Sequence, residues 1–195
     1  IAPDAEGDIA LRHTAQSLAA LTTLVWVGYL STTGVYGDTD GAWVDEATPV
    51  APETRRSQWR VKAEQQCLAW GAEHGVASHI FRLAGIYGPQ RNALRKLVAG
   101  TAKRIDAPGI RFSRTHVADI ASVLQASIAQ PDAGQIYNVC DDQPEAAAVV
   151  TAYAAGLLGI DPPPLQTPDE ADLSAMGRSF YQSSRRVRNE KIKRE

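Results

Sequence analysis

The sequence predicts an α/β protein built on an open, mostly parallel sheet with helices on its faces. Residues 24–31 and 76–83 are predominantly apolar, as strands buried on both faces are, and residues 135–140 form a further short strand-like segment. Between these segments apolar residues recur at helical spacing, so helices and strands alternate along the chain. With 195 residues and 44% hydrophobic content, the chain can bury the core of one domain.

The first helix is predicted over residues 8–21, because Asp8 is a favourable N-cap and apolar residues follow it at helical spacing. The strand over residues 24–31 comes next and stops abruptly in a Ser-Thr-Thr-Gly sequence. Residues 32–53 contain three glycines and two prolines, which predicts a long loop. Loops of this length inside a domain are usually functional.

A second long helix is predicted over residues 56–74, ending at Gly75. Its buried stripe lies at i, i+4, i+8 and i+11 and consists of Trp59, Ala63, Cys67 and Trp70. After the strand over residues 76–83, the sequence predicts a helix over 91–98, a helix over 116–130, the strand over 135–140, a helix over 145–158, a Pro-rich connector over 161–168 and a polar, helical remainder.

Charge and composition exclude several classes of protein. A net charge of −2 and a pI near 6.1 argue against a general nucleic-acid-binding surface, and the basic residues between 185 and 194 are expected to form a solvated helix face. The longest apolar run is too short for a membrane span, so a cytoplasmic protein is expected. The chain starts without Met and ends in a charged run, which indicates a piece of a longer protein. Cys67 and Cys140 lack metal-ligand spacing, so both are predicted to be buried and no metal site is expected.

The candidate site follows from the ends of two strands. In open parallel sheets, ligands bind beyond the carboxyl ends of the strands. The hydroxyls of residues 31–33 follow one strand, and the segment LAGIYGPQR (residues 83–91) follows the next. These two loops are therefore expected to face one crevice. The alternative is an ordinary turn in which Ser and Thr bond the loop backbone.

Four motifs, in order, carry a resemblance to a known family. They are LSTTGVYGD from residue 30, IFRLAGIYGPQR from residue 80, FSRTHVADIASVLQASI from residue 112 and GQIYNVCDDQP from residue 134. Together they resemble the extended short-chain dehydrogenase/reductase superfamily, the NAD(P)-dependent epimerases and dehydratases of nucleotide sugars. The resemblance covers most of residues 29–144.

The resemblance implies a Rossmann-like doubly wound parallel sheet whose N-terminal part is missing, with a small C-terminal α/β substrate-binding portion. Residues 1–100 would complete the nucleotide-binding domain, and residues 101–195 would be mostly substrate-binding, with 135–140 belonging to either part. The implied cofactor is NAD or NADP. The family's G-x-x-G-x-x-G turn, which carries the pyrophosphate, does not occur in this sequence. We therefore expect this chain alone to bind a dinucleotide weakly.

The acid/base position departs from the family's pattern. The family places a Tyr four residues before a Lys on the helix after the long loop, and aligning Glu64 puts Arg56 and Arg60 in those two positions. Starting from Lys62 instead puts Gln58 in the Tyr position. A guanidinium has no acceptor and cannot shuttle a proton, but it can hold a phosphate or carboxylate. Two functions stay open: an atypical oxidoreductase acting on a sugar nucleotide or related phosphorylated substrate, and a non-catalytic NAD(P)-binding sensor or scaffold.

The resemblance also assigns site residues. Thr32 occupies the position of the catalytic Ser or Thr, with Thr33 as the alternative, and Tyr36 is either a substitute acid/base or a ring packed under the loop. The expected cofactor contacts are Ala2, Pro3, Leu30, Ser31, Ala84, Gly85 and Ile86. The expected substrate contacts are Thr33, Arg91 and Arg114. Arg82 is expected to form a buried ion pair, and the expected partners are a small anionic substrate and, as an alternative to a monomer, a second copy of the chain.

Overall fold

Three parallel strands form the central sheet of the computed structural model, which describes residues 2–195. They are β1 (Trp26–Thr32), β3 (Ala77–Leu83) and β7 (Ile136–Val139), in the order β1-β3-β7. β1 pairs in parallel with β3 along its whole length, and β3 pairs in parallel with β7. The predicted strands and the predicted neighbouring of the first two are therefore confirmed, and β7 lies in the main sheet.

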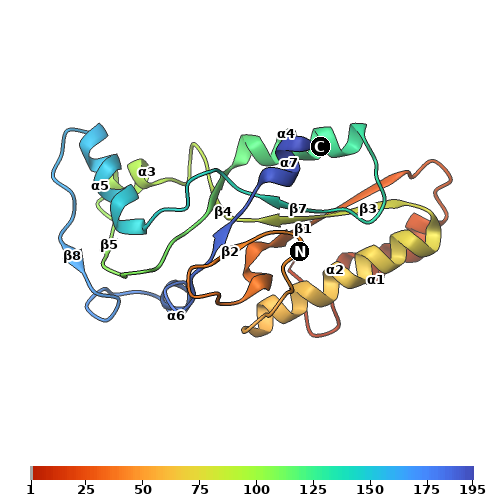
Figure 1. Cartoon of the computed structure of the whole chain (residues 1–195), viewed down its shortest axis with the longest axis horizontal. Coiled ribbons are helices and arrows are strands. Elements are labelled where there is room, and N and C mark those ends of the chain that lie inside the picture. The colour runs from red at the N-terminus through yellow and green to blue at the C-terminus, as the bar shows by residue number, and fades with distance from the viewer. Residues whose placement is uncertain (1) are drawn as a thin grey trace.

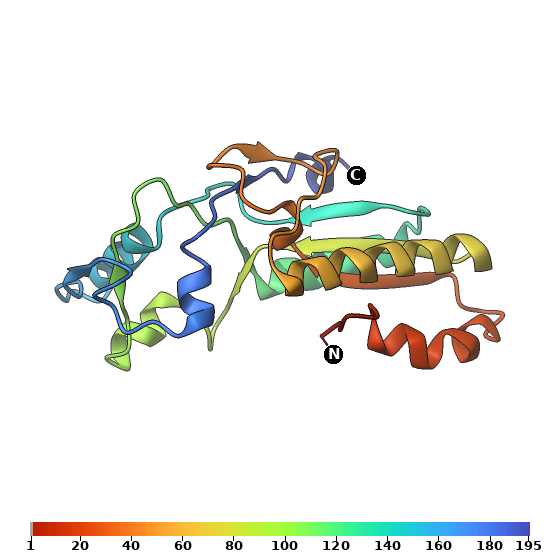
Figure 2. The same cartoon turned by 90° about the horizontal axis from the view of Figure 1, so that it is seen from below.

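Helices cover both faces of this sheet. α2 (Arg55–His74) lies along one face, and α4 (Val117–Ala129) lies on the opposite side (Figure 1, Figure 2). α2 begins where the Thr54 side chain accepts a hydrogen bond from the Ser57 N–H, and it ends at Gly75, which has a left-handed φ of 68°. Its predicted stripe is buried except at Trp59, which is only half-buried. The sheet is thus the middle layer of an α/β/α arrangement.

The first strand differs from its prediction. It was expected to be buried on both faces, but none of its residues except Ser31 is buried, and Leu30 is 42% exposed. The physical reason is that β1 is an edge strand, with one hydrogen-bonded neighbour among residues 2–195. α1 (Ile9–Ala19) is N-capped by Asp8, as predicted, but buries none of its side chains. The run of apolar residues therefore predicted the strand correctly, but the prediction that the strand is buried on both faces was wrong.

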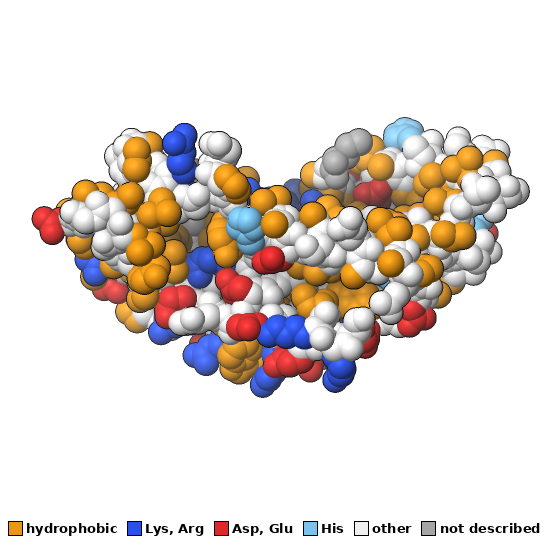
Figure 3. All heavy atoms as spheres, turned by 90° about the horizontal axis from the view of Figure 1, so that it is seen from above, with side chains coloured by type: hydrophobic (Ala, Val, Ile, Leu, Met, Phe, Trp, Pro, Cys, Tyr) orange, Lys and Arg blue, Asp and Glu red, His pale blue; other side chains and the backbone are white. Residues whose placement is uncertain are grey.

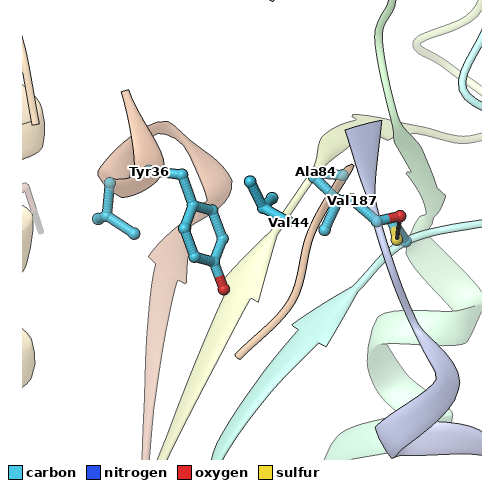
Figure 4. Packing of buried hydrophobic residues seen from close by; sticks show 6 residues of the cluster. Tyr36, Val44, Ala84 and Val187 are labelled. Carbon is cyan, nitrogen blue, oxygen red and sulfur yellow. Dashed lines mark hydrogen bonds between the residues drawn. The ribbon is translucent and has the colours of Figure 1, made fainter. Parts of the chain in front are cut away.

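The long loop contains a short 3-10 helix, η1 (Thr33–Tyr36), and a short strand, β2 (Trp43–Val44). β2 pairs with β9 (Arg186–Val187), so the C-terminal region returns to cover this loop. The buried cluster that results includes Tyr36, Val44, Ala84 and Val187, which Figure 4 shows grouped above the carboxyl ends of the strands. The floor of the candidate crevice is therefore a packed apolar layer.

A second, smaller lobe follows the sheet and lies at its carboxyl side (Figure 1). Its elements are α3 (Ala93–Val98), β5 (Arg104–Ile105), α5 (Ala147–Leu157), β8 (Leu165–Gln166) and α6 (Ala175–Ser179). β4 (Gly85–Tyr87) and β6 (Arg114–His116) pair with each other where the two lobes join. The remainder beyond residue 168 is less helical than predicted, with only α6, β9 and α7 (Glu190–Arg194), because long stretches there form turns.

The free edge of β7 is covered by side chains. The Asn138 N–H donates to Glu46 Oε1 at 2.8 Å, and Lys191 Nζ donates to the Ile136 carbonyl oxygen at 2.9 Å. Lys193 also pairs with Asp142. Arg185, Arg186 and Arg188 precede α7, and Arg185 Nε donates to the Gly37 carbonyl oxygen. The prediction of one solvated helix face is therefore wrong for these three residues, and within α7 Lys191 is half-buried. Among residues 2–195, no helix combines the length and apolarity that crossing a membrane requires.

Candidate functional site

The carboxyl ends of β1 and β3 meet in one row. Thr32, the last residue of β1, is the register partner of Leu83, the last residue of β3. The chain continues from Leu83 through Ala84 into β4, whose residues are exposed. Figure 3 shows the surface hollowed between the two lobes. The two loops that the sequence assigned to one crevice therefore start side by side.

The turn after Thr32 is held by hydrogen bonds and close packing. Thr32 is half-buried, and its Oγ1 accepts a hydrogen bond from the Gly34 N–H at 3.1 Å. A Cβ atom placed on Gly34 would lie 3.3 Å from Ser57 Oγ and 3.4 Å from Thr32 Oγ1. The first turn of α2 therefore packs directly against the Thr32 turn. Arg56 precedes Ser57 in this first turn of α2.

The two arginines of α2 have different environments. Arg60 is half-buried, and its Nη1 donates to Tyr29 Oη at 3.0 Å and to the Leu30 carbonyl oxygen at 2.9 Å. It lines a hollow of about 410 Å³ between α1 and the edge of β1. Arg56 is exposed, and within residues 2–195 its side chain makes no hydrogen bond or ion pair. The structure therefore separates the two residues that the alignment grouped together.

Tyr36 lies where the alternative interpretation placed it, packed under the loop. Its ring is 1% exposed, and Figure 4 shows the hydroxyl pointing away from the turn and along the strands. The hydroxyl donates to Asn138 Oδ1 at 2.8 Å and accepts from Arg82 Nη1 at 3.0 Å. Burial raises the pKa of Tyr36 despite the neighbouring Arg82 cation. A phenol in this position is not available to a ligand in the crevice.

The expected ion pair of Arg82 is present. Arg82 Nη2 lies 2.8 Å from Glu64 Oε2, and both side chains are buried. Burial acts to lower the pKa of Arg82, but the hydrogen bonds and charge of Glu64 outweigh it and raise that pKa. Glu64 was not predicted from the sequence to be the partner of Arg82. A carboxylate beside the apolar stripe of a helix, opposite an arginine in a buried strand, was the signal that could have identified the pair.

The expected cofactor contacts after β3 are one buried residue followed by two exposed residues of β4. Ala84 is buried and its N–H donates to the Val139 carbonyl oxygen, whereas Gly85 is exposed and Ile86 is 37% exposed. A Cβ on Gly85 would lie 3.3 Å from the Ser113 carbonyl oxygen, so a larger residue would crowd β6. Exposed apolar side chains and main chain beside a hydroxyl suit a flat, amide-bearing ring. The residues present fit the nicotinamide end of a dinucleotide.

The remaining expected cofactor contacts divide into two groups. Ser31 is buried and its hydroxyl donates to Glu64, so it faces α2. Ala2 is exposed and Pro3 is buried, and they precede a turn that Gln66 holds against α2 by donating to the Glu6 carbonyl oxygen. These residues are near the sheet edge, and their contact with a cofactor stays a prediction.

The expected substrate contacts are also unequal. Thr33 is buried in the first turn of η1. Arg91 is exposed and lies in a turn closed by Gly88, before α3 rather than at its start, because Asn92 is the N-cap. Arg114 is half-buried, and its Nη1 donates to the carbonyl oxygens of Phe112 and Glu145. Burial lowers the pKa of Arg114. Arg91 is the more available cation.

Comparison with known proteins places this geometry in a family. The profile of the NAD dependent epimerase/dehydratase family matches residues 8–140. The chain belongs to this family. The Escherichia coli K12 protein YeeZ is 33% identical over 135 residues, which are 69% of this chain and 47% of that protein. A dTDP-glucose 4,6-dehydratase of Streptomyces niveus is 28% identical over 120 residues, covering 57% and 35% of the two chains. The family member described here thus spans about half the length of YeeZ.

Solved structures of other family-like proteins share the fold. A functionally unknown conserved protein from Silicibacter pomeroyi is 54% identical, with a TM-score of 0.92 over all of this chain and 68% of its own. The Streptomyces venezuelae dehydratase DesIV, solved with NAD and DAU bound, has a TM-score of 0.73 at 19% identity, covering 95% of this chain and 56% of its own. RMD from Pseudomonas aeruginosa, complexed with NADPH, has a TM-score of 0.74 at 18% identity, covering 94% and 64%. These likenesses confirm the predicted Rossmann-like α/β fold.

Proposed function

We propose that this chain provides the nicotinamide-facing and substrate-binding part of an NAD(P)-dependent oxidoreductase of the epimerase/dehydratase kind. The observation that supports it best is the juxtaposition at the ends of β1 and β3, where the half-buried Thr32 hydroxyl lies in register with the strand that leads into exposed Gly85 and Ile86. A sugar nucleotide or related phosphorylated compound is the proposed substrate. The presence of the family profile over residues 8–140 supports the same assignment.

The proposed contacts follow from exposure. Ile86 and its neighbour Gly85 are exposed and are proposed to contact the nicotinamide ring, and Leu30 is proposed to add apolar surface from the edge of β1. When bound, the coenzyme supplies hydride-transfer chemistry. The Thr32 hydroxyl, already oriented by the Gly34 N–H that it accepts, donates its own proton to a substrate oxygen. Whether the coenzyme is NAD or NADP is not set by these residues.

Arg56 is proposed to hold an anionic group of the substrate. It is exposed at the first turn of α2, next to the Thr32 turn, and it carries no partner within residues 2–195. A guanidinium binds phosphate or carboxylate through parallel hydrogen bonds and stays protonated at physiological pH. Arg91 and Arg114 are proposed to contact the same substrate from the second lobe. A proton acceptor at the helix position of the family's Tyr is absent from this arrangement.

A second candidate function is a non-catalytic NAD(P)-binding sensor or scaffold. The observation that favours it is the lack of an available phenol. The alignment puts Arg56 and Arg60 at the acid/base positions of α2, and Tyr36 is buried. Such a protein would bind the coenzyme through the same contacts without turning it over. The two candidates therefore differ in turnover and not in binding.

The experiment uses the whole protein, with whatever residues flank this sequence naturally. NADH and NADPH are titrated calorimetrically, and the protein is then incubated with NAD or NADP and a panel of nucleotide sugars and sugar phosphates. Products are followed by NMR as well as by coenzyme absorbance, because an epimerase or dehydratase returns the hydride to its substrate and leaves no net absorbance change. Thr32→Ala should abolish turnover, and Thr32→Ser, which retains the hydroxyl at the same position, serves as the matched control. Binding without turnover for every substrate supports the sensor. Absence of coenzyme binding contradicts both candidates.

A further inference from the structure

A buried polar network joins the carboxyl ends of all three strands to α2. Ser31, Arg82 and Asn138 occupy one row across the sheet, since Ser31 is the register partner of Arg82 and Arg82 that of Asn138. Glu64 of α2 and Tyr36 of η1 complete the network. All five side chains are at most 6% exposed.

Arg82 is at the centre of this network. Its Nε lies 3.2 and 3.3 Å from the two carboxylate oxygens of Glu64, and its Nη2 donates to Glu64 Oε2 at 2.8 Å. On its other side, Nη1 donates to Tyr36 Oη, and the guanidinium lies 4.9 Å from the centre of the Tyr36 ring. Ser31 donates to Glu64 Oε1 and Tyr36 donates to Asn138. The planar guanidinium therefore fixes directions as well as distances.

Four of the five members are connected through the chain to residues of the candidate crevice. Ser31 precedes Thr32, Tyr36 ends the 3-10 turn that Thr32 caps, and Arg82 lies two residues before Ala84. Glu64 is on the helix whose first turn carries Arg56 and packs against Gly34. A displacement of Arg82 would therefore move both loops of the crevice relative to α2.

We propose that Glu64 and Arg82 are positioning residues, which hold the Thr32 turn, the Ala84–Ile86 main chain and the start of α2 in one fixed arrangement before any ligand binds. This inference rests on the proposed function for the identity of the ligand, but not for the arrangement itself. Stability alone is a poor explanation of the pair, because apolar side chains of similar volume often stabilise a protein as well as a buried ion pair does. What apolar residues lack is the directed contact that links three strands and a helix.

The test replaces the pair by apolar residues, in the whole protein. Glu64→Leu combined with Arg82→Met should melt within a few degrees of the unsubstituted protein, since neither charge is left unpaired. Hydrogen exchange of the amides in residues 31–36 and 84–86 should be about tenfold faster, while the exchange of α4 stays unchanged. The dissociation constant for NADPH should rise about tenfold, because small misplacements of binding groups weaken an ordered site strongly.

Milder variants keep the test decisive if the double variant does not fold. Ser31→Ala and Tyr36→Phe each remove one contact of the network and leave the ion pair in place, and each should accelerate exchange in residues 31–36 by about threefold. The matched control is Arg178→Met, which removes the surface ion pair with Asp169 in the other lobe and should alter none of these values. Unchanged exchange in residues 31–36 of the variants that fold would overturn the inference. If the unsubstituted protein binds no coenzyme, the proposed function fails, and hydrogen exchange still decides the positioning role.

Discussion

Arginine-to-alanine substitutions on α2 should separate a structural residue from a ligand-binding one. Arg60→Ala removes a guanidinium that donates to Tyr29 Oη and to the Leu30 carbonyl oxygen and lies 5.7 Å from the Tyr29 ring centre. Hydrogen bonds from charged donors contribute about 1.5–3 kcal/mol when buried, and an exposed cation–π contact contributes about 0.5–1 kcal/mol. Because Arg60 is only half-buried, we expect a total loss of roughly 2 kcal/mol.

For a protein of this size, that loss lowers the melting temperature by roughly 4–8 °C. Arg56→Ala should change the free energy of unfolding by about 0.5 kcal/mol or less, since the side chain is exposed and has no partner in the described chain. Urea denaturation followed by tryptophan fluorescence measures the free energy of unfolding of both variants. Arg55→Ala, on the same exposed turn, is the control for loss of a positive charge. If Arg56→Ala destabilised the protein as much as Arg60→Ala does, Arg56 would be structural, and its assignment to an anionic ligand would be wrong.

Three further predictions concern the core. Phe81→Ala, at a fully buried ring stacked 5.9 Å from that of Tyr137, should lower the free energy of unfolding by about 3–5 kcal/mol in urea denaturation; a loss below about 1 kcal/mol would mean that the packing is described wrongly. Burial lowers the pKa of His79, so the unfolded chain binds its proton more readily, and the stability that His79 contributes above about pH 6.5 should be lost as the pH falls. His79→Gln should reduce that pH dependence, whereas replacing an exposed histidine should not. Burial raises the pKa of Cys67 to about 11 and that of Cys140 to about 12, so a thiol reagent at neutral pH should modify both only after denaturation, and rapid reaction of the native protein would contradict their burial.

The sequence predicted the fold well because the relevant signals are local. Apolar continuity located the strands, and Asp8 and Gly75 marked a helix start and a helix end through their own hydrogen bonds and backbone conformation. The burial of β1 was predicted wrongly, since an apolar segment does not reveal how many neighbours a strand has.

The candidate site was less predictable because it depends on side-chain partners that are distant in sequence. The alignment grouped Arg56 with Arg60. Arg60, however, donates hydrogen bonds to the Tyr29 hydroxyl and the Leu30 carbonyl oxygen, which belong to a strand about thirty residues earlier in the chain. The network around Glu64 contains a bond between residues 102 positions apart, Tyr36 and Asn138. The Arg82 ion pair was foreseen, from the cost of leaving a charge unpaired in a buried strand, and the packing of Tyr36 under the loop was one of two interpretations.

The central claim is that the ends of β1 and β3 receive the nicotinamide. The most direct measurement is a crystal structure of the whole protein with an oxidised coenzyme bound. We expect the nicotinamide ring within about 4 Å of Gly85 and Ile86, on the side of the crevice that carries the Thr32 hydroxyl, with Arg56 facing the space left for the substrate. A coenzyme bound elsewhere, with its nicotinamide away from Thr32, would contradict the account.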